Sequence, residues 1–284
     1  MKKVYEPTSI SLGDKKAIEN GRPEISLMME AAKACFEAIS WNQKVLIVTG
    51  KGNNGGDGFA LALLLKRNGN DVSLLLSETP TTSAASYYFE ECKKAGIEYS
   101  LYSNETLFEQ PDIVDALFGI GFKGEVQEKY VPLIEAINNS KGRIISIDAN
   151  SGLDLSNGLA SCAVISDITL SISSLKPGYF LSQGKDYVGS IIELPLLDPV
   201  GESYSLIEES DVKSFFEPRK NFSNKGNYGY VGILQLSLLH LCGNYALHEL
   251  GTSLRAIILE SPRSGLQTVA KHKDDLFLGL RKFA

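Results

Sequence analysis

The stretch from Val45 to Leu65, VLIVTGKGNNGGDGFALALLL, constrains the fold more than any other part of the chain. The apolar run Val45–Val48 predicts a buried strand, the glycines of Gly50–Gly58 predict a turn, and the run Phe59–Lys66 predicts a helix. Such a turn directs several backbone N–H groups at one point, where the positive end of the helix dipole adds to their field. The stretch therefore predicts an anion site, and in an α/β protein the usual anion is a phosphate.

The same turn satisfies the dinucleotide-binding pattern G-x-G-x-x-G at Gly50, Gly52 and Gly55. Glu78 ends the next predicted strand, near the position at which such proteins carry a ribose-binding acid. Taken alone, the pattern is also compatible with a tight βα turn that binds nothing. Five glycines within Gly50–Gly58 cost more chain entropy than a simple turn requires, and this favours a ligand.

The polar residues of the turn are unusual for a dinucleotide loop. Asn53 and Asn54 add side-chain carbonyls that can coordinate a cation or bond a ribose. Asp57 would repel a nearby diphosphate, so we expect it to cap the helix or to bond a hydroxyl. No Lys-Ser or Lys-Thr pair ends the turn, which argues against a Walker loop and against ATP hydrolysis.

Composition limits the partners and the compartment. The chain has 284 residues, enough for one large domain or two smaller ones, and its net charge of −6 gives no reason to expect nucleic acid or an acidic membrane as a partner. The start, MKKVYEPTSI, lacks the apolar region of a secretory signal, and no apolar run approaches a membrane span. Four scattered cysteines predict reduced thiols in a cytoplasmic protein: Cys35, Cys92, Cys162 and Cys242.

Histidine usage limits the chemistry. All three histidines lie late in the chain, at His240, His248 and His272. A Ser-His-Asp triad or a histidine zinc site built from residues around the glycine turn is therefore excluded. Carboxylate, lysine, tyrosine and hydroxyl chemistry remains, and a metal held there would be a hard cation with oxygen ligands.

Strand and helix patterns alternate along the chain. Helical patterns occur at Ser26–Ser40, Phe59–Arg67, Ala84–Ala95 and Val131–Ser140. Strand patterns occur at Val45–Val48, Val72–Leu76, Ile113–Leu117, Ile144–Ile147, Ile165–Ile172 and Ile191–Leu194. This alternation predicts an α/β protein with a mostly parallel, doubly wound sheet.

Polar residues follow several of these strands, at the sheet edge where such folds bind ligands. Asp115 and the segment 119–125 follow the third strand, Asp148 and Ser151 follow the fourth, and Lys176 follows the fifth. Each has a simpler explanation, because the two aspartates could cap turns and Lys176 could be solvated. Their joint placement favours a functional site.

Four motifs occur together in the chain: GNNGGDG at 52–58, DALFGIGFKGE at 115–125, IDANSGLD at 147–154 and LKPG at 175–178. In this order and spacing they resemble the NAD(P)H-hydrate epimerases, the YjeF N-terminal domain family, over about residues 1–210. The resemblance implies a three-layer α/β/α Rossmann-like fold, usually as a homodimer. It also implies interconversion of the R and S epimers of hydrated NADH or NADPH, after which a partner dehydratase restores the S form to normal cofactor.

The resemblance also implies roles for individual residues. Potassium ligands are implied at Asn54, Asp115 and Ser151, and Asp148 is implied as a further substrate contact. The substrate-binding loops are implied to comprise Asn53, Asn54, Gly55, Gly56, Asp57, Gly119, Ile120, Gly121, Phe122, Lys123, Gly124 and Glu125. The implied potassium ligands are oxygen donors that together carry one formal charge, which suits a large monovalent ion. Asp115 beside a phosphate site would be unfavourable without a cation.

A mechanism without histidine can be written for this chemistry. The hydrate carries a hydroxyl on the ring carbon next to nitrogen, and the nitrogen lone pair would help to expel it as an iminium-like cation forms. Water then returns on either face of the ring. We expect Asp148 to protonate the leaving oxygen and to stabilise the cation, and Lys176 is the second candidate, as a charge or proton partner.

A second resemblance begins after the first. The segment 211–234 is similar to the start of the ADP-dependent NAD(P)H-hydrate dehydratase domain, but residues 235–284 do not follow that family's pattern. We therefore expect domains at 1–210 and 211–284, the second being a truncated or aberrant start of a ribokinase-like domain, and no dehydratase activity.

Two other functions stay open. The literal G-x-G-x-x-G and Glu78 fit a NAD(P)-dependent oxidoreductase, although Asp57 and the second loop at 119–125 weaken that interpretation. A nucleotide-binding module without catalysis would keep the glycine loops but would need neither Asp148 nor a cation site. The sequence does not distinguish the hydrate of NADH from that of NADPH.

Overall fold

The computed structural model describes residues 2–213, 222, 230–236, 254–261 and 265–271. The chain divides into two compact units, Met1–Asp211 and Val212–Ala284. The first unit contains a sheet of seven strands in the order β4-β3-β2-β5-β6-β7-β8, and all neighbouring strands are parallel. These strands are β2 (Lys44–Thr49), β3 (Asp71–Leu76), β4 (Glu98–Leu101), β5 (Asp112–Ala116), β6 (Arg143–Ile147), β7 (Ile168–Ile172) and β8 (Ser190–Leu194).

The strand order confirms the doubly wound α/β prediction. The chain runs outward from β2 through β3 to β4, then returns to place β5 on the other side of β2 and continues through β6 and β7 to β8. The winding direction therefore reverses between β2 and β5. In open parallel sheets such a reversal leaves a crevice at the carboxyl ends of the two strands, where ligands bind.

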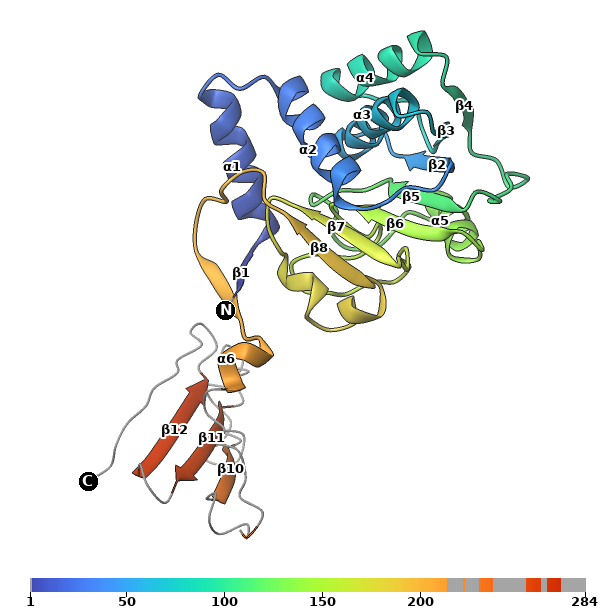
Figure 1. Ribbon diagram of the computed structural model, residues 1–284. Coiled ribbons are helices and arrows are strands. Elements are labelled where there is room, and N and C mark those ends of the chain that lie inside the picture. Colours follow the sequence, from blue (N-terminus) through green and yellow to red (C-terminus); the bar gives the residue numbers. More distant parts are fainter. Residues whose placement is uncertain (1, 214–221, 223–229, 237–253, 262–264, 272–284) are drawn as a thin grey trace, which may run out of the picture. The chain divides into compact units, whose positions relative to one another are not determined.

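Layers on both faces bury the sheet (Figure 1). Along β2, Val45 and Ile47 pack on one face with the residues of α2, α3 and α4, whereas Leu46 and Val48 pack on the other face with α5. The helices are α2 (Glu24–Ala38), α3 (Asn53–Arg67), α4 (Ser83–Lys94) and α5 (Val131–Asn138). Short 3-10 turns at 128–130, 177–179 and 184–186 complete the second face.

The helix α3 begins earlier than the sequence indicates. We expected a turn as far as Gly58 and a helix from Phe59, but α3 starts at Asn53 and includes most of the GNNGGDG motif. A Cβ atom at Gly55 would lie 2.0 Å from the carbonyl oxygen of Gly50, and one at Gly56 would lie 2.5 Å from the Met28 side chain. These glycines therefore allow close packing around a regular helix, and the expectation of an extended turn was wrong.

Four elements of the first unit were not expected: β1 (Lys2–Tyr5), α1 (Pro7–Glu19), β4 and β9 (Ser203–Leu206). The strands β1 and β9 form a separate antiparallel pair. The strand β7 also begins at Ile168, three residues later than expected. The expected residues 165–167 instead form the loop before β7, in which the Asp167 carboxylate accepts the Ile144 N–H at 2.8 Å.

The second unit contains an antiparallel sheet in the order β10-β11-β12, formed by Tyr230–Leu236, Leu254–Ser261 and Gly265–Lys271. A short helix α6 (Glu209–Lys213) precedes this sheet in the chain. The expectation of an aberrant segment at 235–284 falls largely outside the described residues, as do His240, His248 and His272. Within the described part of the chain, no helix combines the length and the apolar character needed to cross a membrane.

Candidate active site

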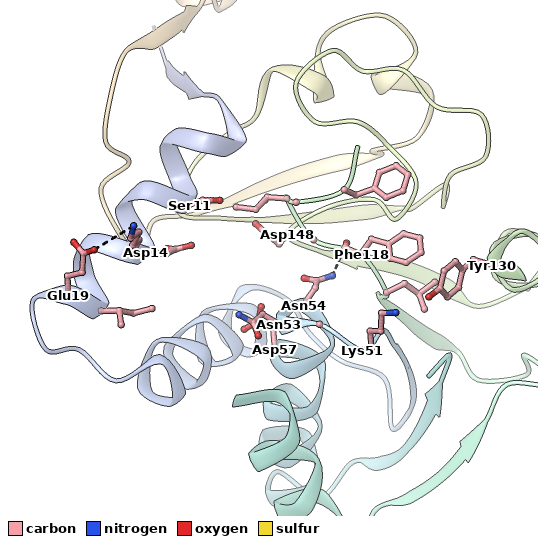
Figure 2. Close-up of a pocket in the computed structure, with 18 residues that line it drawn as sticks. Ser11, Asp14, Glu19, Lys51, Asn53, Asn54, Asp57, Phe118, Tyr130 and Asp148 are labelled. Carbon is pink, nitrogen blue, oxygen red and sulfur yellow. Dashed lines mark hydrogen bonds and ion pairs between the residues drawn. The ribbon is translucent and has the colours of Figure 1, made fainter. Parts of the chain in front are cut away.

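A cavity of about 810 Å³ lies at the carboxyl ends of β2 and β5 (Figure 2). Its walls come from α1, from the turn after β2 with the start of α3, from the loop 117–122 after β5, and from Asp148 after β6. Tyr130 also lines it. The cavity therefore occupies the position that the reversal of the sheet predicts for a ligand.

Many of the residues expected to bind substrate line this cavity: Asn53, Asn54, Asp57, Gly119, Ile120, Gly121, Phe122 and Asp148. Gly55 and Gly56 are buried in α3 and do not line it. Lys123, Gly124 and Glu125 continue the second loop outside its walls, exposed to solvent. The expected residues thus form a wall that comes from two segments of the chain. In each segment some residues line the cavity, and the others lie outside its lining.

The N-terminus of α3 faces the cavity. Gly52 precedes the helix without a side-chain cap, and both Gly52 and Asn53 line the cavity. The first N–H groups of a helix have no partner within the helix, and they carry its positive dipole end. This end of α3 is therefore suited to an anionic group such as a phosphate.

Asp148 and Lys176 form an ion pair at the cavity. Lys176 Nζ lies 2.6 Å from Asp148 Oδ1, and it also donates to Ser171 Oγ at 3.1 Å and to the Ile172 carbonyl at 2.9 Å. The Lys176 side chain is completely buried, whereas the Asp148 side chain is 14% exposed. Asp148 therefore presents a carboxylate to the cavity while its counter-charge stays within the protein.

The backbone holds this pair in a specific geometry. Asp148 has φ = 63°, a left-handed conformation that is uncommon for a residue with a side chain. The Tyr179 hydroxyl donates to the Asp148 carbonyl at 2.6 Å, and the Leu170 carbonyl accepts the Asp148 N–H at 2.8 Å. The alternative that Lys176 is solvated was wrong. Burial lowers the pKa of its ammonium, but the effects of Asp148 and Tyr179 together outweigh burial, and the pKa of Lys176 is raised.

Asp115 lies deeper and accepts four hydrogen bonds. Ser151 Oγ donates to it at 2.5 Å, the Ser151 N–H at 2.9 Å, Ser146 Oγ at 3.0 Å and the Leu117 N–H at 3.2 Å. The Asp115 side chain is completely buried. Burial raises the pKa of this carboxyl, and the hydrogen bonds from Ser151, Leu117 and Ser146 oppose that rise. No cation among the described residues pairs with it.

The three residues implied as potassium ligands meet around Phe118. Asn54 Nδ2 donates to the Phe118 carbonyl at 3.0 Å, and the Phe118 N–H donates at 2.8 Å to Ser151 Oγ, which bonds Asp115. Asn54 Oδ1 is buried and accepts no hydrogen bond. The set thus offers oxygen atoms with a single carboxylate. Groups of three or more His, Cys, Asp or Glu side chains that could hold a metal are absent from the described residues.

Sequence reasoning missed the wall that α1 provides. Ser11, Asp14, Lys15, Ile18 and Glu19 line the cavity, and none was expected to. Asp14 faces the cavity from the side opposite α3 (Figure 2). Since the helix buries only Pro7, Ile10 and Gly13, its sequence has no strong apolar periodicity that could have indicated it.

Glu78 lies beside the cavity but is occupied by other side chains. Its carboxylate accepts hydrogen bonds from the Tyr130 hydroxyl and from Lys129 Nζ, the latter at 2.8 Å, and Lys51 Nζ lies 3.5 Å away. The bonds from Lys129 and Tyr130 lower the pKa of Glu78 to about 2. Glu78 is therefore already bound to two lysines and a tyrosine at the position expected of a ribose-binding acid.

The fold and the cavity define a doubly wound α/β protein with a nucleotide-type site at its sheet reversal. Residues 24–178 match the family described as YjeF-related protein N-terminus. The chain belongs to this family.

The relatives are of two kinds. A bifunctional NAD(P)H-hydrate repair enzyme of Coxiella burnetii is 30% identical over 94% of this chain and 56% of its own length. An NAD(P)H-hydrate epimerase of Pirellula staleyi is 32% identical over 74% of this chain and 98% of its own length. This chain therefore spans about half the length of the bifunctional relative and nearly all of the epimerase.

A solved structure gives the same fold. The crystal structure of the yeast protein YNL200c aligns with a TM-score of 0.55 at 20% identity, covering 78% of this chain and 96% of that chain. At this identity the likeness supports the three-layer α/β architecture alone.

Proposed function

We propose that this protein interconverts the R and S forms of hydrated NADH or NADPH. The observation that carries the proposal is the Asp148–Lys176 pair, which faces a cavity whose opposite wall is the N-terminus of α3. The helix end provides a site for the diphosphate of a nicotinamide nucleotide, and the carboxylate provides a charge for the reacting ring. The Pirellula epimerase, which aligns over 98% of its own length, supports the same reaction.

Asp148 has a defined role in this proposal. Expulsion of the ring hydroxyl leaves a positive charge on the nitrogen and its neighbouring carbon, which an anion at the cavity wall stabilises. The buried Lys176 ammonium offsets the Asp148 charge and limits the movement of its carboxylate through a contact of 2.6 Å. Lys176 therefore acts through Asp148, as a positioning residue.

Potassium is proposed as a bound cation of the same site. Asn54, Asp115 and Ser151 would hold the cation together with the Phe118 carbonyl. The buried Asn54 Oδ1 accepts no hydrogen bond, which supports a role for this atom in coordinating the cation. A monovalent cation would offset the Asp115 charge next to an anionic substrate. Its expected contribution is to substrate binding and to the shape of the loop 117–122.

A coupled assay tests the reaction. The purified chain is given R-hydrated NADH in potassium buffer with an S-specific dehydratase and its nucleotide, and the recovery of NADH absorbance is followed. Recovery faster than spontaneous epimerisation supports the proposal, and its absence from a folded protein overturns it in favour of a binding module. Hydride transfer to any substrate would instead favour an oxidoreductase. Repeating the assay in sodium buffer tests the cation.

The same assay addresses the second unit and the partners. The alignment with the Coxiella relative covers more of this chain than the first unit alone provides, which supports a relationship between the second unit and the bifunctional enzymes. Omitting the added dehydratase tests the expectation that this chain lacks that activity. Sedimentation of the purified chain tests the proposed homodimer.

A further inference from the structure

Expulsion of a hydroxyl from the hydrated ring requires a proton donor, and Asp148 is poorly suited to that task. Its Oδ1 atom lies 2.6 Å from a buried ammonium that has no other anionic partner among the described residues. Protonation of Asp148 would leave that ammonium uncompensated in the protein interior, at a high cost. The sequence-based expectation that Asp148 both donates the proton and stabilises the cation therefore needs a second acid.

Two carboxyl groups line both the main cavity and a smaller adjoining cavity with Asp148, whereas a third, that of Glu24, lines only the smaller cavity and accepts a hydrogen bond from Asn53 at 2.7 Å. Asp14 on α1 and Asp57 on α3 line the main cavity with Asp148 (Figure 2). All three also line the smaller adjoining cavity, which has a volume of about 160 Å³. The smaller cavity has apolar walls that include Leu27, Met28 and Ile172. Asp14, Asp57 and Asp148 thus line both cavities, where a bound ring would meet them.

We propose that Asp14 is the catalytic acid and base of the epimerisation, transferring the proton to and from the oxygen on the ring carbon. This inference rests on the proposed function. It assigns a role to a helix that lies outside the residues 24–178 matched by the family.

The charges around Asp14 favour a carboxyl group that exchanges its proton. Burial and the Asp148 carboxylate raise the pKa of Asp14 to about 6, and the Lys176 ammonium opposes that rise. The ammonium of Lys15, the next residue on α1, is exposed and pairs with the Glu19 carboxylate, with 3.8 Å between Lys15 Nζ and Glu19 Oε1. Asp148 is paired with a buried ammonium, whereas Asp14 lies near the Asp148 charge, and this arrangement separates a proton donor from a stabilising anion.

Asp57 is less suited to the same role. Burial and the charges of Asp148, Asp14 and Glu24 raise the pKa of Asp57 well above its usual range. A carboxyl group whose pKa is raised this far gives up its proton reluctantly, so it suits a hydrogen-bond donor better than a proton-transfer group. It also lies in the first turns of α3, next to the proposed diphosphate site. Asp57 therefore fits a hydrogen bond to substrate.

The helix α1 is fixed firmly enough to position a catalytic group. The strand β1 before it pairs with β9, and the Tyr5 N–H donates at 2.9 Å to the carbonyl of Leu175, the neighbour of Lys176. At Gly13, a Cβ atom would lie 2.8 Å from the Asp198 carbonyl oxygen, so α1 packs directly on the backbone at Asp198. Asp14 is thereby tied to the same turn that carries Lys176.

The proposed step balances. Protonated Asp14 gives its proton to the ring hydroxyl, the carbon–oxygen bond breaks with its electron pair on oxygen, and water leaves as the nitrogen lone pair forms a C=N⁺ bond. Water then adds to the other face, its lone pair forming the new carbon–oxygen bond as the C=N π pair returns to nitrogen. Its extra proton returns through cavity water to the Asp14 carboxylate. No proton or electron is consumed.

The test compares kcat/KM between pH 5 and pH 8 for the full chain and three variants, with the coupling dehydratase in excess at every pH. Wild-type kcat/KM should fall about tenfold per pH unit above pH 6, because the reaction begins from protonated Asp14. In Asp14→Asn, kcat should fall by at least about 100-fold with KM changed less than about threefold, and the pH dependence should disappear. Asp57→Asn should raise KM and keep the pH dependence, and Glu37→Gln, on an exposed part of α2, should match wild type.

Asp14→Asn should melt at or above the wild-type temperature, because it removes one of three neighbouring acids. If that variant does not fold, Asp14→Ser provides a second removal of the carboxyl group. Retention of the pH dependence in a folded Asp14 variant, or its loss in Asp57→Asn alone, overturns the assignment while the proposed function stands. A wild-type chain without epimerase activity overturns the proposed function itself.

Discussion

Asp115 lies near the carboxyl end of β5 and Asp148 follows the neighbouring parallel strand β6, yet the protein satisfies the two carboxylates in opposite ways. Asp115 is completely buried and accepts four hydrogen bonds, all from neutral groups. Asp148 is partly open to the cavity and has one charged partner, Lys176. Position at a strand end therefore does not define an acid's role: Asp115 holds the loop that lines the cavity, and Asp148 presents its carboxylate to the cavity.

The largest effect on the free energy of unfolding is expected from Lys176→Met. This variant tests whether the buried Lys176 ammonium stabilises the Asp148 carboxylate. The change leaves Asp148, Ser171 Oγ and the Ile172 carbonyl without their shared donor. Breaking a buried ion pair by removing one partner costs about 3–5 kcal/mol of unfolding free energy. Trp41, the only tryptophan, lies in the first unit, so its fluorescence during urea unfolding reports on that unit.

Lys185→Met is the matched control, because Lys185 is exposed and forms part of a short turn in the same region. A loss below about 1 kcal/mol in Lys176→Met would mean that the ammonium contributes no more than a surface ion pair does. Asp148 would then have to be held in place by its backbone contacts.

Asp148→Asn should have the next largest effect, and it should act on turnover. The amide keeps the shape of the side chain but removes the negative charge that would stabilise the ring cation. We expect kcat to fall about 100- to 1000-fold, with KM little changed. The coupled epimerase assay under saturating substrate measures this, with circular dichroism as a check on folding. Unchanged turnover would remove Asp148 from the mechanism.

Asp115→Asn should show the opposite pattern, a loss of stability larger than any direct effect on the chemical step. Each Asp115 oxygen accepts two hydrogen bonds, so an amide nitrogen at either position faces two donors. We expect about 2–3 kcal/mol of lost unfolding free energy. The variant should also respond equally to potassium and sodium. A variant as stable as wild type that keeps a potassium preference would contradict the role given to Asp115.

The sequence predicted much of the sheet and part of the site, for a physical reason. Buried parallel strands are apolar runs, and polar residues at their carboxyl ends share one edge, so the placement of Asp115, Asp148, Ser151 and Lys176 at that edge was predicted. Their roles stay predictions. The strand β1 and the helix α1 were not predicted, because their contacts join distant parts of the chain: Lys2 of β1 pairs with Leu206, and Gly13 of α1 packs on Asp198.

The helical start of α3 was also missed. Glycines usually indicate a turn, but those of the GNNGGDG motif allow the helix to approach Met28 and the Gly50 carbonyl. A glycine can form a turn or can allow a helix to pack closely, and only the tertiary structure shows which of the two applies.

Glu78→Gln should have the smallest effect, and it extends the comparison to a third acid near a strand end. Glu78 has two lysines and a tyrosine as partners, but its side chain is 32% exposed. Exposed ion pairs contribute about 0–1 kcal/mol. Because Lys129 and Tyr130 lower the pKa of Glu78 to about 2 in the folded state, below the usual 4.5, its contribution to stability is complete above pH 4.5.

That contribution should shrink as the pH falls from 4.5 toward 2, so the difference in unfolding free energy between wild type and Glu78→Gln should be larger at pH 7 than at pH 3.5. Urea unfolding at the two values measures it. The variant should also keep the wild-type KM, since its carboxylate is already bound by protein side chains. A tenfold rise in KM would instead give Glu78 the ribose-binding role of an oxidoreductase loop and would weaken the contrast between acids that hold structure and acids that meet substrate.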